Sequence, residues 1–315
     1  MAEYAVKMIK LEPIHLNFLF GSRHIFSFFF LGYVYPKFFT DTPSALTKTI
    51  EDAIPCGTDV ALMMDRPVSR ELPKLTKTSN VLQYVPRQNP RYYIDITNDV
   101  PACFARPSAK SRRELARKLR KFEEACGDLP VVREYRLPGE MPAFHRLVRE
   151  VSLKTTHGHL IRRFAGTEKF QRDLIQMAEQ RGVRGYILFH GERPVAFEYC
   201  RILGDVLTGE MCGYDPEFAK WSPGAVLLYA LLRKASQEGE FRLFDFGPGY
   251  APYKELIATG EVLCADVFYF RQTIPHLAAV TTHSAFLSAC RFGAKVLELM
   301  GLRSRGTYPR KSLDS

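Results

Sequence analysis

Apolar and polar residues follow a strand–helix–strand pattern in the C-terminal third of the chain. The pattern predicts a strand at Val206–Tyr214, an apolar helix at Ser222–Gln237 and a second strand at Phe241–Phe246. A Gly-Pro-Gly loop follows and ends in a Tyr-Lys pair. Parallel strands joined by a helix are typical of α/β proteins. The pattern therefore places a helix N-terminus and several polar side chains at one end of a sheet.

The same order occurs near the start of the chain. The aromatic run Ile25–Tyr35 is predicted to be a buried strand, because it is shorter than the ~20 apolar residues that a membrane-spanning helix needs. A helix is predicted from Thr42-Pro43 through Ile54, and a short buried strand at Asp59–Met64. The repeat predicts an α/β protein with two related halves.

The remaining elements follow from helical and two-residue periodicity and from Gly and Pro punctuation. Gly191-Glu192-Arg193 is expected to close a hairpin, and the basic stretch Arg303–Lys311 to form a tail. The predicted helices are Lys110–Ala125, Pro142–Leu153, Glu168–Gln180 and Ala278–Met300, and the predicted strands are Gly185–His190, Pro194–Leu203 and Val262–Gln272.

Composition and charge indicate the class of binding partner and the cellular compartment. The 315 residues are 46% hydrophobic, and 44 Lys and Arg against 34 Asp and Glu give a formal charge of +10. Such a balance predicts an anionic partner, which leaves a phosphorylated cofactor, an acidic carrier protein, nucleic acid and an anionic membrane open. Seven scattered cysteines and the lack of a secretory signal favour free thiols in the cytoplasm. The histidines do not cluster with cysteines, so no metal site is expected.

The predicted helix Lys110–Ala125 is strongly basic. Leu115, Leu119 and Phe122 share one helical face, and Ser111 with Glu114 fits a capping box. The helix is either a surface element that packs by this stripe or an electrostatic landing site for an acidic partner. Its basic residues are Arg112, Arg113, Arg117, Lys118, Arg120 and Lys121.

The start of the predicted helix at Ser222 has the features of an anion site. Ser is a favoured N-cap, Pro223 suits the first helical position, and Gly224 permits close approach of a ligand. First-turn N–H groups and the helix dipole favour a phosphate, and Lys220 adds a positive charge just before them. A well-capped structural helix is the alternative.

A second group of polar residues follows the next strand. Asp245 ends an apolar strand, where α/β sheets bind ligands, and Tyr253 and Lys254 begin the next short helix. We expect the three to converge, although an Asp245–Lys254 ion pair with a purely structural role, and a Tyr253 that simply packs, are open alternatives.

Two strand glutamates and a loop histidine are candidate bases. Alternation groups Glu198 with Ala196, Cys200 and Ile202, and Glu210 with Thr208, Cys212 and Tyr214. A carboxylate on such a face has a raised pKa unless it is paired, and it then suits general base catalysis near neutral pH. His157 and His159 lie in a polar loop and are either bases, substrate contacts or plain loop residues.

These motifs together resemble a known family. The segments GYDPEFAKWSPGAVLL, FDFGPG and YK resemble GNAT-fold acyltransferases of the CelD/BioF2-like type, which are related to Fem-type aminoacyltransferases and N-acyl amino acid synthases. The resemblance is strongest from Tyr186 to Phe270, extends back through SAKSRRELARKLRKFEEA, and includes the earlier FLGYVYPKFFTDTPSAL and DVALMMDRP. It implies a tandem GNAT-like α/β fold with mixed central sheets flanked by helices and an abbreviated first half. The expected domains are residues 1–98, residues 99–275, and a C-terminal helix and tail at 276–315.

The resemblance also implies a mechanism. The pantetheine arm of an acyl thioester would lie between Val206–Tyr214 and Phe241–Phe246, with its pyrophosphate at the following helix start. Tyr253 would protonate the leaving thiolate, Glu210 or Glu198 would be the base, and Lys254 and Asp245 would orient the acceptor or stabilise charge. The phosphate end would be held by Lys220, Trp221, Ser222, Pro223, Gly224, Ala225 and Val226.

The sequence departs from the usual GNAT phosphate loop, Arg/Gln-x-x-Gly-x-Gly/Ala. Lys220, Pro223 and Ala225 stand at its key positions, and Pro223 lacks one N–H that would bind pyrophosphate. This leaves an acyl carrier protein and aminoacyl-tRNA open as donors beside acyl-CoA.

The resulting hypothesis is a cytoplasmic N-acyltransferase. It would use an acyl-CoA or acyl-pantetheine thioester as co-substrate, without a permanent cofactor, and acylate an amine on an amino acid, a sugar, or an envelope or exopolysaccharide precursor. DNA is not an expected partner, and peripheral contact with the inner face of an anionic membrane is left open. The rivals are Fem-type aminoacyl transfer and a non-catalytic GNAT scaffold.

Overall fold

The computed structural model describes residues 10–20, 23–35, 54, 57–78, 80–97, 109–126, 131–155, 166–248 and 251–299. The helix predicted from Thr42, the basic tail, and His157 with His159 lie outside these residues. The chain divides into two compact units. Unit 1 draws on Met1–Pro90, Pro248–Tyr250 and Val262–Ser315, and unit 2 on Arg91–Gly247 and Ala251–Glu261.

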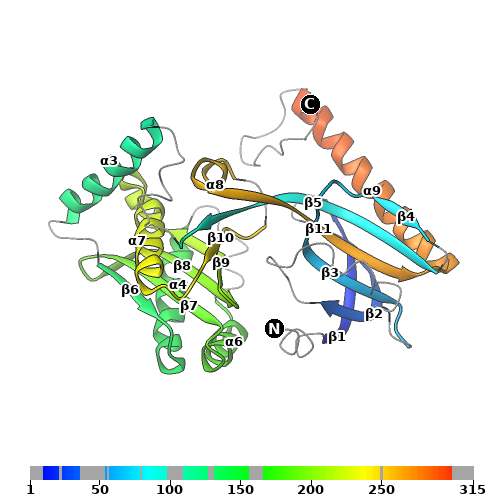
Figure 1. Ribbon diagram of the computed structural model, residues 1–315, viewed down its shortest axis with the longest axis horizontal. Helices are drawn as coiled ribbons and strands as arrows, with labels where there is room; N and C mark the ends of the chain where they lie inside the picture. Colours follow the sequence, from blue (N-terminus) through cyan, green and yellow to red (C-terminus); the bar gives the residue numbers. More distant parts are fainter. Residues whose placement is uncertain are drawn as a thin grey trace. The chain divides into compact units, whose positions relative to one another are not determined.

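Unit 2 contains the strand–helix–strand pattern on which the site depends. Its strands lie in the order β10, β9, β8, β7, β6, and the end of β5 pairs with β10 (Figure 1). Neighbours are antiparallel except β9 and β10, which are parallel, as the sequence predicted. The strands are β6 (Val131–Tyr135), β7 (Val183–His190), β8 (Arg193–Leu203), β9 (Val206–Tyr214) and β10 (Leu243–Asp245).

Helices pack on both faces of this sheet. Every residue of β7 from Val183 to Phe189 is buried, because alternate side chains face opposite helical layers. Val183, Ile187 and Phe189 pack with α4 and α6, whereas α7 contacts β6 to β9. The helices are α3 (Ala109–Cys126), η1 (Pro138–Glu140), α4 (Met141–Lys154), α6 (Glu168–Glu179), η2 (Pro216–Trp221), α7 (Pro223–Glu238) and α8 (Pro252–Ile257).

Unit 1 is also a mixed sheet. Its strands lie in the order β1, β2, β3, β11, β5, with β4 on β5, and β2 runs parallel to β3 as predicted. Strands β1, β4 and β5 were not predicted from the sequence, and neither was β6 in unit 2. The elements are β1 (Lys10–Phe20), β2 (Arg23–Tyr35), β3 (Val60–Pro67), β4 (Leu75–Lys77), β5 (Val81–Asp95), β11 (Gly260–Arg271) and α9 (Ile274–Leu299).

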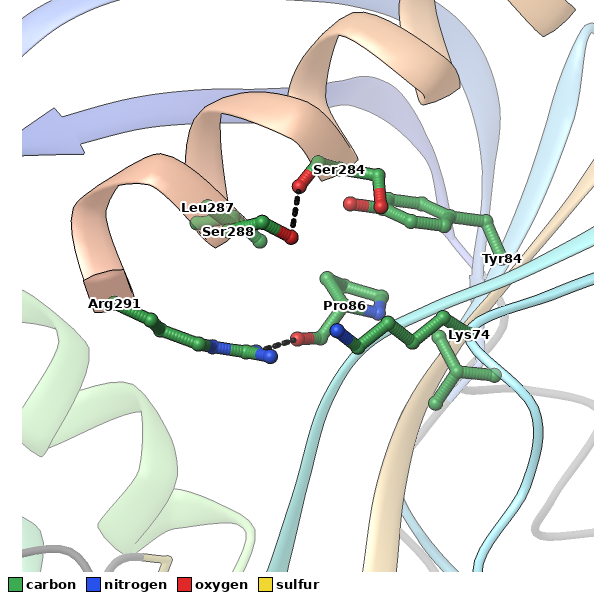
Figure 2. Close-up of a pocket in the computed structure, with 8 residues that line it drawn as sticks. Lys74, Tyr84, Pro86, Ser284, Leu287, Ser288 and Arg291 are labelled. Atoms are coloured by element: carbon green, nitrogen blue, oxygen red, sulfur yellow. Dashed lines mark hydrogen bonds between the residues drawn. The ribbon is translucent and has the colours of Figure 1, made fainter.

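Helix α9 covers one face of the sheet of unit 1. Val280 packs in a core with Leu82 and Phe270, and Tyr84 Oη lies 2.7 Å from His283 Nδ1. Figure 2 shows a small cavity beside this contact, where Arg291 Nη2 donates to Pro86 O over 3.2 Å. No described helix combines the length and the apolar character needed to cross a membrane. The predicted α/β fold, with mixed sheets flanked by helices, is confirmed.

The core of unit 2 makes a testable prediction at Phe144 of α4. This side chain is fully buried among α4, α6, β7 and β8, so Phe144→Ala should lower the free energy of unfolding by about 3–5 kcal/mol. Leu153, on the same helix, is 60% exposed, so Leu153→Ala should change it by no more than about 0.5 kcal/mol. Urea unfolding followed by tryptophan fluorescence reports unit 2, because Trp221 is the only tryptophan. Equal effects of the two substitutions would contradict the packing.

Candidate active site

The candidate site begins where the parallel pair β9–β10 ends. The last paired residues are Thr208 and Asp245. The chain then turns at Gly247, which has a φ of 70°, and a Cβ there would lie 2.7 Å from Gly209 O. Glycine therefore suits this turn both for its left-handed backbone and for the close approach to β9. Beyond these residues β9 continues as far as Tyr214 without a β10 partner.

Asp245 is held in a buried ion pair at this point. Its side chain is 0% exposed, and Arg91 Nε lies 2.9 Å from both carboxylate oxygens, with a further bond from Nη2. Thr208 Oγ1 and the Gly247 N–H also donate to it, over 3.2 and 3.0 Å. The carboxylate thus ties β5, β9 and the turn after β10 together.

Lys254 lies close to the same network, as the sequence predicted, and two backbone carbonyls hold its ammonium. Its Nζ donates to Phe246 O over 2.9 Å and lies 3.5 Å from Gly247 O. Burial lowers the pKa of the ammonium, and electrostatic interactions with Cys212, Asp245 and Glu198 oppose that shift. Lys254 therefore connects the turn after β10 electrostatically with Glu198 and Cys212.

Glu198 on β8 stands directly opposite Cys212 on β9. The Cys212 thiol donates a hydrogen bond to the carboxylate, and a Cβ on Gly209 would lie 2.7 Å from Glu198 Oε1. Burial raises the pKa of Glu198 to about 8, against opposing contributions from Lys254 and Cys212. A carboxylate with this pKa can accept a proton near neutral pH.

The expected alternation along β9 is wrong at Glu210. The register shifts so that Met211 faces Tyr199 and Gly209 faces Cys200, which leaves Glu210 as one extra residue in β9. Such a β-bulge interrupts the two-residue alternation, so Cys212 shares a face with Gly209 rather than with Thr208. The Glu210 carboxylate lies 3.9 Å from Arg201 Nη1.

Tyr253 precedes Lys254 on α8 and is 46% exposed. Its ring meets the Phe246 ring edge-on, with 6.1 Å between centroids. The structure therefore brings Tyr253 and Lys254 to the turn that follows Asp245, as the sequence predicted, with the phenol ring accessible.

The start of α7 differs from the expected cap. Ser222 adopts a left-handed conformation, with φ 54° and ψ 52°, and its side chain makes no capping hydrogen bond. Its carbonyl accepts bonds from the N–H groups of Ala225 and Val226, over 3.0 and 3.2 Å. Pro223 takes the predicted first position, and the side chains of Pro223 and Val226 are buried. The prediction of Ser222 as a side-chain cap is therefore wrong.

Positive charge gathers beside this helix start. Lys220 Nζ lies 4.1 Å from the centre of the Trp221 ring, a cation–π contact. The basic helix α3 packs against both η2 and α7, and the side chain of Phe122 on α3 is buried. Arg113, Arg120 and Lys121 on α3 are exposed. The side chains of Ser111 and Glu114 lie outside the described residues.

Sequence reasoning missed Arg91 as a site residue and gave Cys212 no role. Arg91 lies 154 residues from its partner Asp245, so no local pattern could connect them. The pairing of Cys212 with Glu198 depends on the bulge, which shifts the register by one residue and leaves no local signature.

Comparison with known proteins bears on this site. Residues 109–255 match the family model described as the acetyltransferase (GNAT) domain. This segment runs from α3 into α8 and includes Glu198, Cys212, Asp245 and Lys254. No curated protein matches the chain.

Solved structures resemble the chain at low identity. The C-terminal domain of a putative lysylphosphatidylglycerol synthetase from Agrobacterium fabrum is 12% identical, with a TM-score of 0.48, over 82% of this chain and 84% of that one. FemX is 11% identical, with a TM-score of 0.40, over 87% and 92%. A tandem GNAT protein from the clavulanic acid biosynthesis pathway is 10% identical, with a TM-score of 0.38, over 80% of each chain. At these values the likenesses carry no argument about activity.

The buried ion pair predicts a large loss of stability when one partner is removed. Arg91→Met leaves the Asp245 carboxylate buried without its counter-charge, which should cost about 3–5 kcal/mol in the free energy of unfolding. The double variant Arg91→Met/Asp245→Leu should recover most of that loss, because no charge remains buried. Lys169→Ala, which breaks an exposed ion pair with Asp173, should cost about 0.5 kcal/mol or less. Urea unfolding by Trp221 fluorescence measures all three, and additive losses in the double variant would contradict the pairing.

The raised pKa of Glu198 predicts how stability depends on pH. Between 4.5, the ordinary value, and about 8, the folded protein holds a proton that the unfolded chain releases. The Glu198 contribution to the free energy of unfolding is therefore full at low pH and is lost as the pH rises to about 8. Glu198→Gln should flatten this part of the pH–stability curve. Parallel curves for the two proteins would show that Glu198 titrates normally.

Proposed function

We propose that the protein is an N-acyltransferase that moves an acyl group from a thioester to an amine. The observation that carries the proposal is the placement of Glu198 within the GNAT domain, beside the point where β9 and β10 part. A carboxylate with a pKa of about 8 supplies a base matched to an amine substrate near neutral pH. An extended pantetheine arm would lie where these two strands separate.

In the proposed reaction the amine nitrogen attacks the thioester carbonyl, and Glu198 accepts the proton, directly or through one water. The carbon–nitrogen bond forms, the carbon–sulfur bond breaks, and the thiolate takes a proton from the exposed phenol of Tyr253. Asp245 is a positioning residue, because Arg91, Thr208 and Gly247 already occupy its oxygens. Lys254 contributes positive charge close to Glu198.

The phosphate end of the donor would bind at the start of α7. Lys220 and the basic helix α3, which packs against η2 and α7, supply positive charge there. Pro223 removes one N–H from the first turn. The charge on α3 suits the acidic surface of an acyl carrier protein as well as the phosphates of acyl-CoA. The acceptor would be a small amine or amino sugar, in line with the CelD/BioF2-like resemblance.

The test measures thiol release from acyl-CoA and from acyl carrier protein in the presence of a panel of amines. Glu198→Gln should lower kcat by about 100- to 10,000-fold, because the base is lost while the size of the side chain is kept. Tyr253→Phe should lower kcat as well. Glu210→Gln, one strand away at the bulge, is the matched control and should keep most of the activity.

Other outcomes decide between the alternatives. A loss of activity in Glu210→Gln without a loss in Glu198→Gln would make Glu210 the base. Reversing charge with Arg113→Glu/Arg120→Glu should raise KM more for the carrier protein than for acyl-CoA if the carrier is the donor. Turnover with charged tRNA alone, in a salt-sensitive manner, would support Fem-type aminoacyl transfer and overturn thioester use. No turnover with any donor would favour a binding scaffold.

A further inference from the structure

Cys212 is a nucleophile that the proposed reaction leaves unused. It lies on β9 beyond the last pair with β10, on the segment where the two strands have parted. The residue is exposed, in contrast to Cys200 and Cys264, which are buried. Its position therefore combines access for a substrate with the place where a thioester would lie under the proposed function.

The partner of Cys212 is a base. Cys212 and Glu198 face each other across β8 and β9, and the thiol donates its hydrogen bond to the carboxylate. The pKa of the thiol is raised, first by the negative charge of Glu198 and then by the protein atoms around the sulfur. The resting sulfur is therefore a protonated thiol, and the ionised form of Glu198, which forms as the pH approaches 8, is the base that can take its proton. This is how a neutral nucleophile is activated by an adjacent general base.

Lys254 completes the group. Its ammonium interacts electrostatically with both Glu198 and Cys212, and it is anchored by the Phe246 carbonyl at 2.9 Å. A fixed positive charge near the sulfur favours the negative charge that develops on an attacking thiol and on the carbonyl oxygen. Gly209 keeps the space beside Glu198 Oε1 free of a side chain, since a Cβ there would lie within 2.7 Å.

We propose that acyl transfer passes through Cys212, which takes the acyl group from the thioester donor before the amine receives it. This inference rests on the proposed thioester-dependent acyl transfer and specifies its route. The structural feature behind it is the Cys212–Glu198 pair beside Lys254 at the open end of β9.

The two steps balance. In the first, the Cys212 sulfur attacks the carbonyl carbon, its proton passes to Glu198, and the donor's carbon–sulfur bond breaks. On this route the leaving thiolate takes up the proton that Glu198 has just received, in place of a proton from Tyr253, so the donor thiol is released and an acyl-Cys212 thioester remains. In the second, the amine attacks this thioester and gives its proton to Glu198. The Cys212 sulfur leaves and recovers that proton, which restores the resting pair.

The test uses the acetyl thioester of N-acetylcysteamine, a small donor that needs no phosphate site. Without an amine, intact-mass spectrometry should find one acetyl group per chain, and peptide mapping should place it on Cys212. Hydroxylamine should remove it. The acetylation rate should fall by about 100-fold in Glu198→Gln. Cys290→Ala, which changes a half-exposed cysteine on α9 in unit 1, should acetylate at the wild-type rate.

Measuring turnover with an amine acceptor distinguishes transfer through acyl-Cys212 from direct transfer to the amine. Cys212→Ala should lower kcat by at least about 100-fold, and it should abolish acetyl exchange between the donor and a labelled free thiol in the absence of amine. Trp221 fluorescence verifies that the variant is folded. If Cys212→Ala keeps its turnover, the covalent route is overturned and direct transfer stands. If the wild-type protein neither acetylates Cys212 nor turns over any thioester, both the route and the proposed function fail.

Discussion

The buried pairing of Arg91 with Asp245 is the constraint on which the site depends. A charged carboxylate in a fully buried position is unfavourable unless its oxygens are matched by donors, and here Arg91, Thr208 and the Gly247 N–H supply them. Because these donors come from β5, β9 and the turn after β10, the pairing decides where β10 ends. The turn that it fixes also carries the carbonyls that anchor Lys254.

A single extra residue in β9 decides which side chains meet. Without the bulge at Glu210, two-residue alternation would put Cys212 on the face of Thr208, away from Glu198. With it, Cys212 stands opposite Glu198, and Glu210 lies near Arg201. The bulge thus separates two glutamates that look equivalent in the sequence. Burial raises the pKa of Glu198 to about 8.

At the start of α7, the sequence predicted the position of Pro223 correctly but not the conformation of Ser222. Pro223 occupies the first helical position for a reason that is visible in the sequence, since it has no N–H to leave unpaired. Ser222, however, takes a left-handed conformation instead of the extended backbone typical of a capping residue, and its hydroxyl makes no capping hydrogen bond. Lys220 and the basic helix α3 place positive charge beside the first turn of α7. That turn has one backbone N–H donor fewer than usual, because Pro223 has none.

Much of unit 2 could be read from the sequence alone. Most elements between Lys110 and Gln272, with β6 as an exception, follow from periodicity and from the positions of Gly and Pro, which act over a few residues. The parallel strand pair, the first-turn Pro223 and the placement of Tyr253 and Lys254 on a short helix follow in the same way. The segments that carry the strongest GNAT resemblance lie in the same region. Strands β1 and β5, the Arg91–Asp245 pair and the Glu198–Cys212 pair could not be read this way. They depend on strand register and on contacts between residues far apart in the sequence, such as the 154 residues between Arg91 and Asp245. Only the packed tertiary structure decides these contacts, because long-range pairing leaves no local pattern.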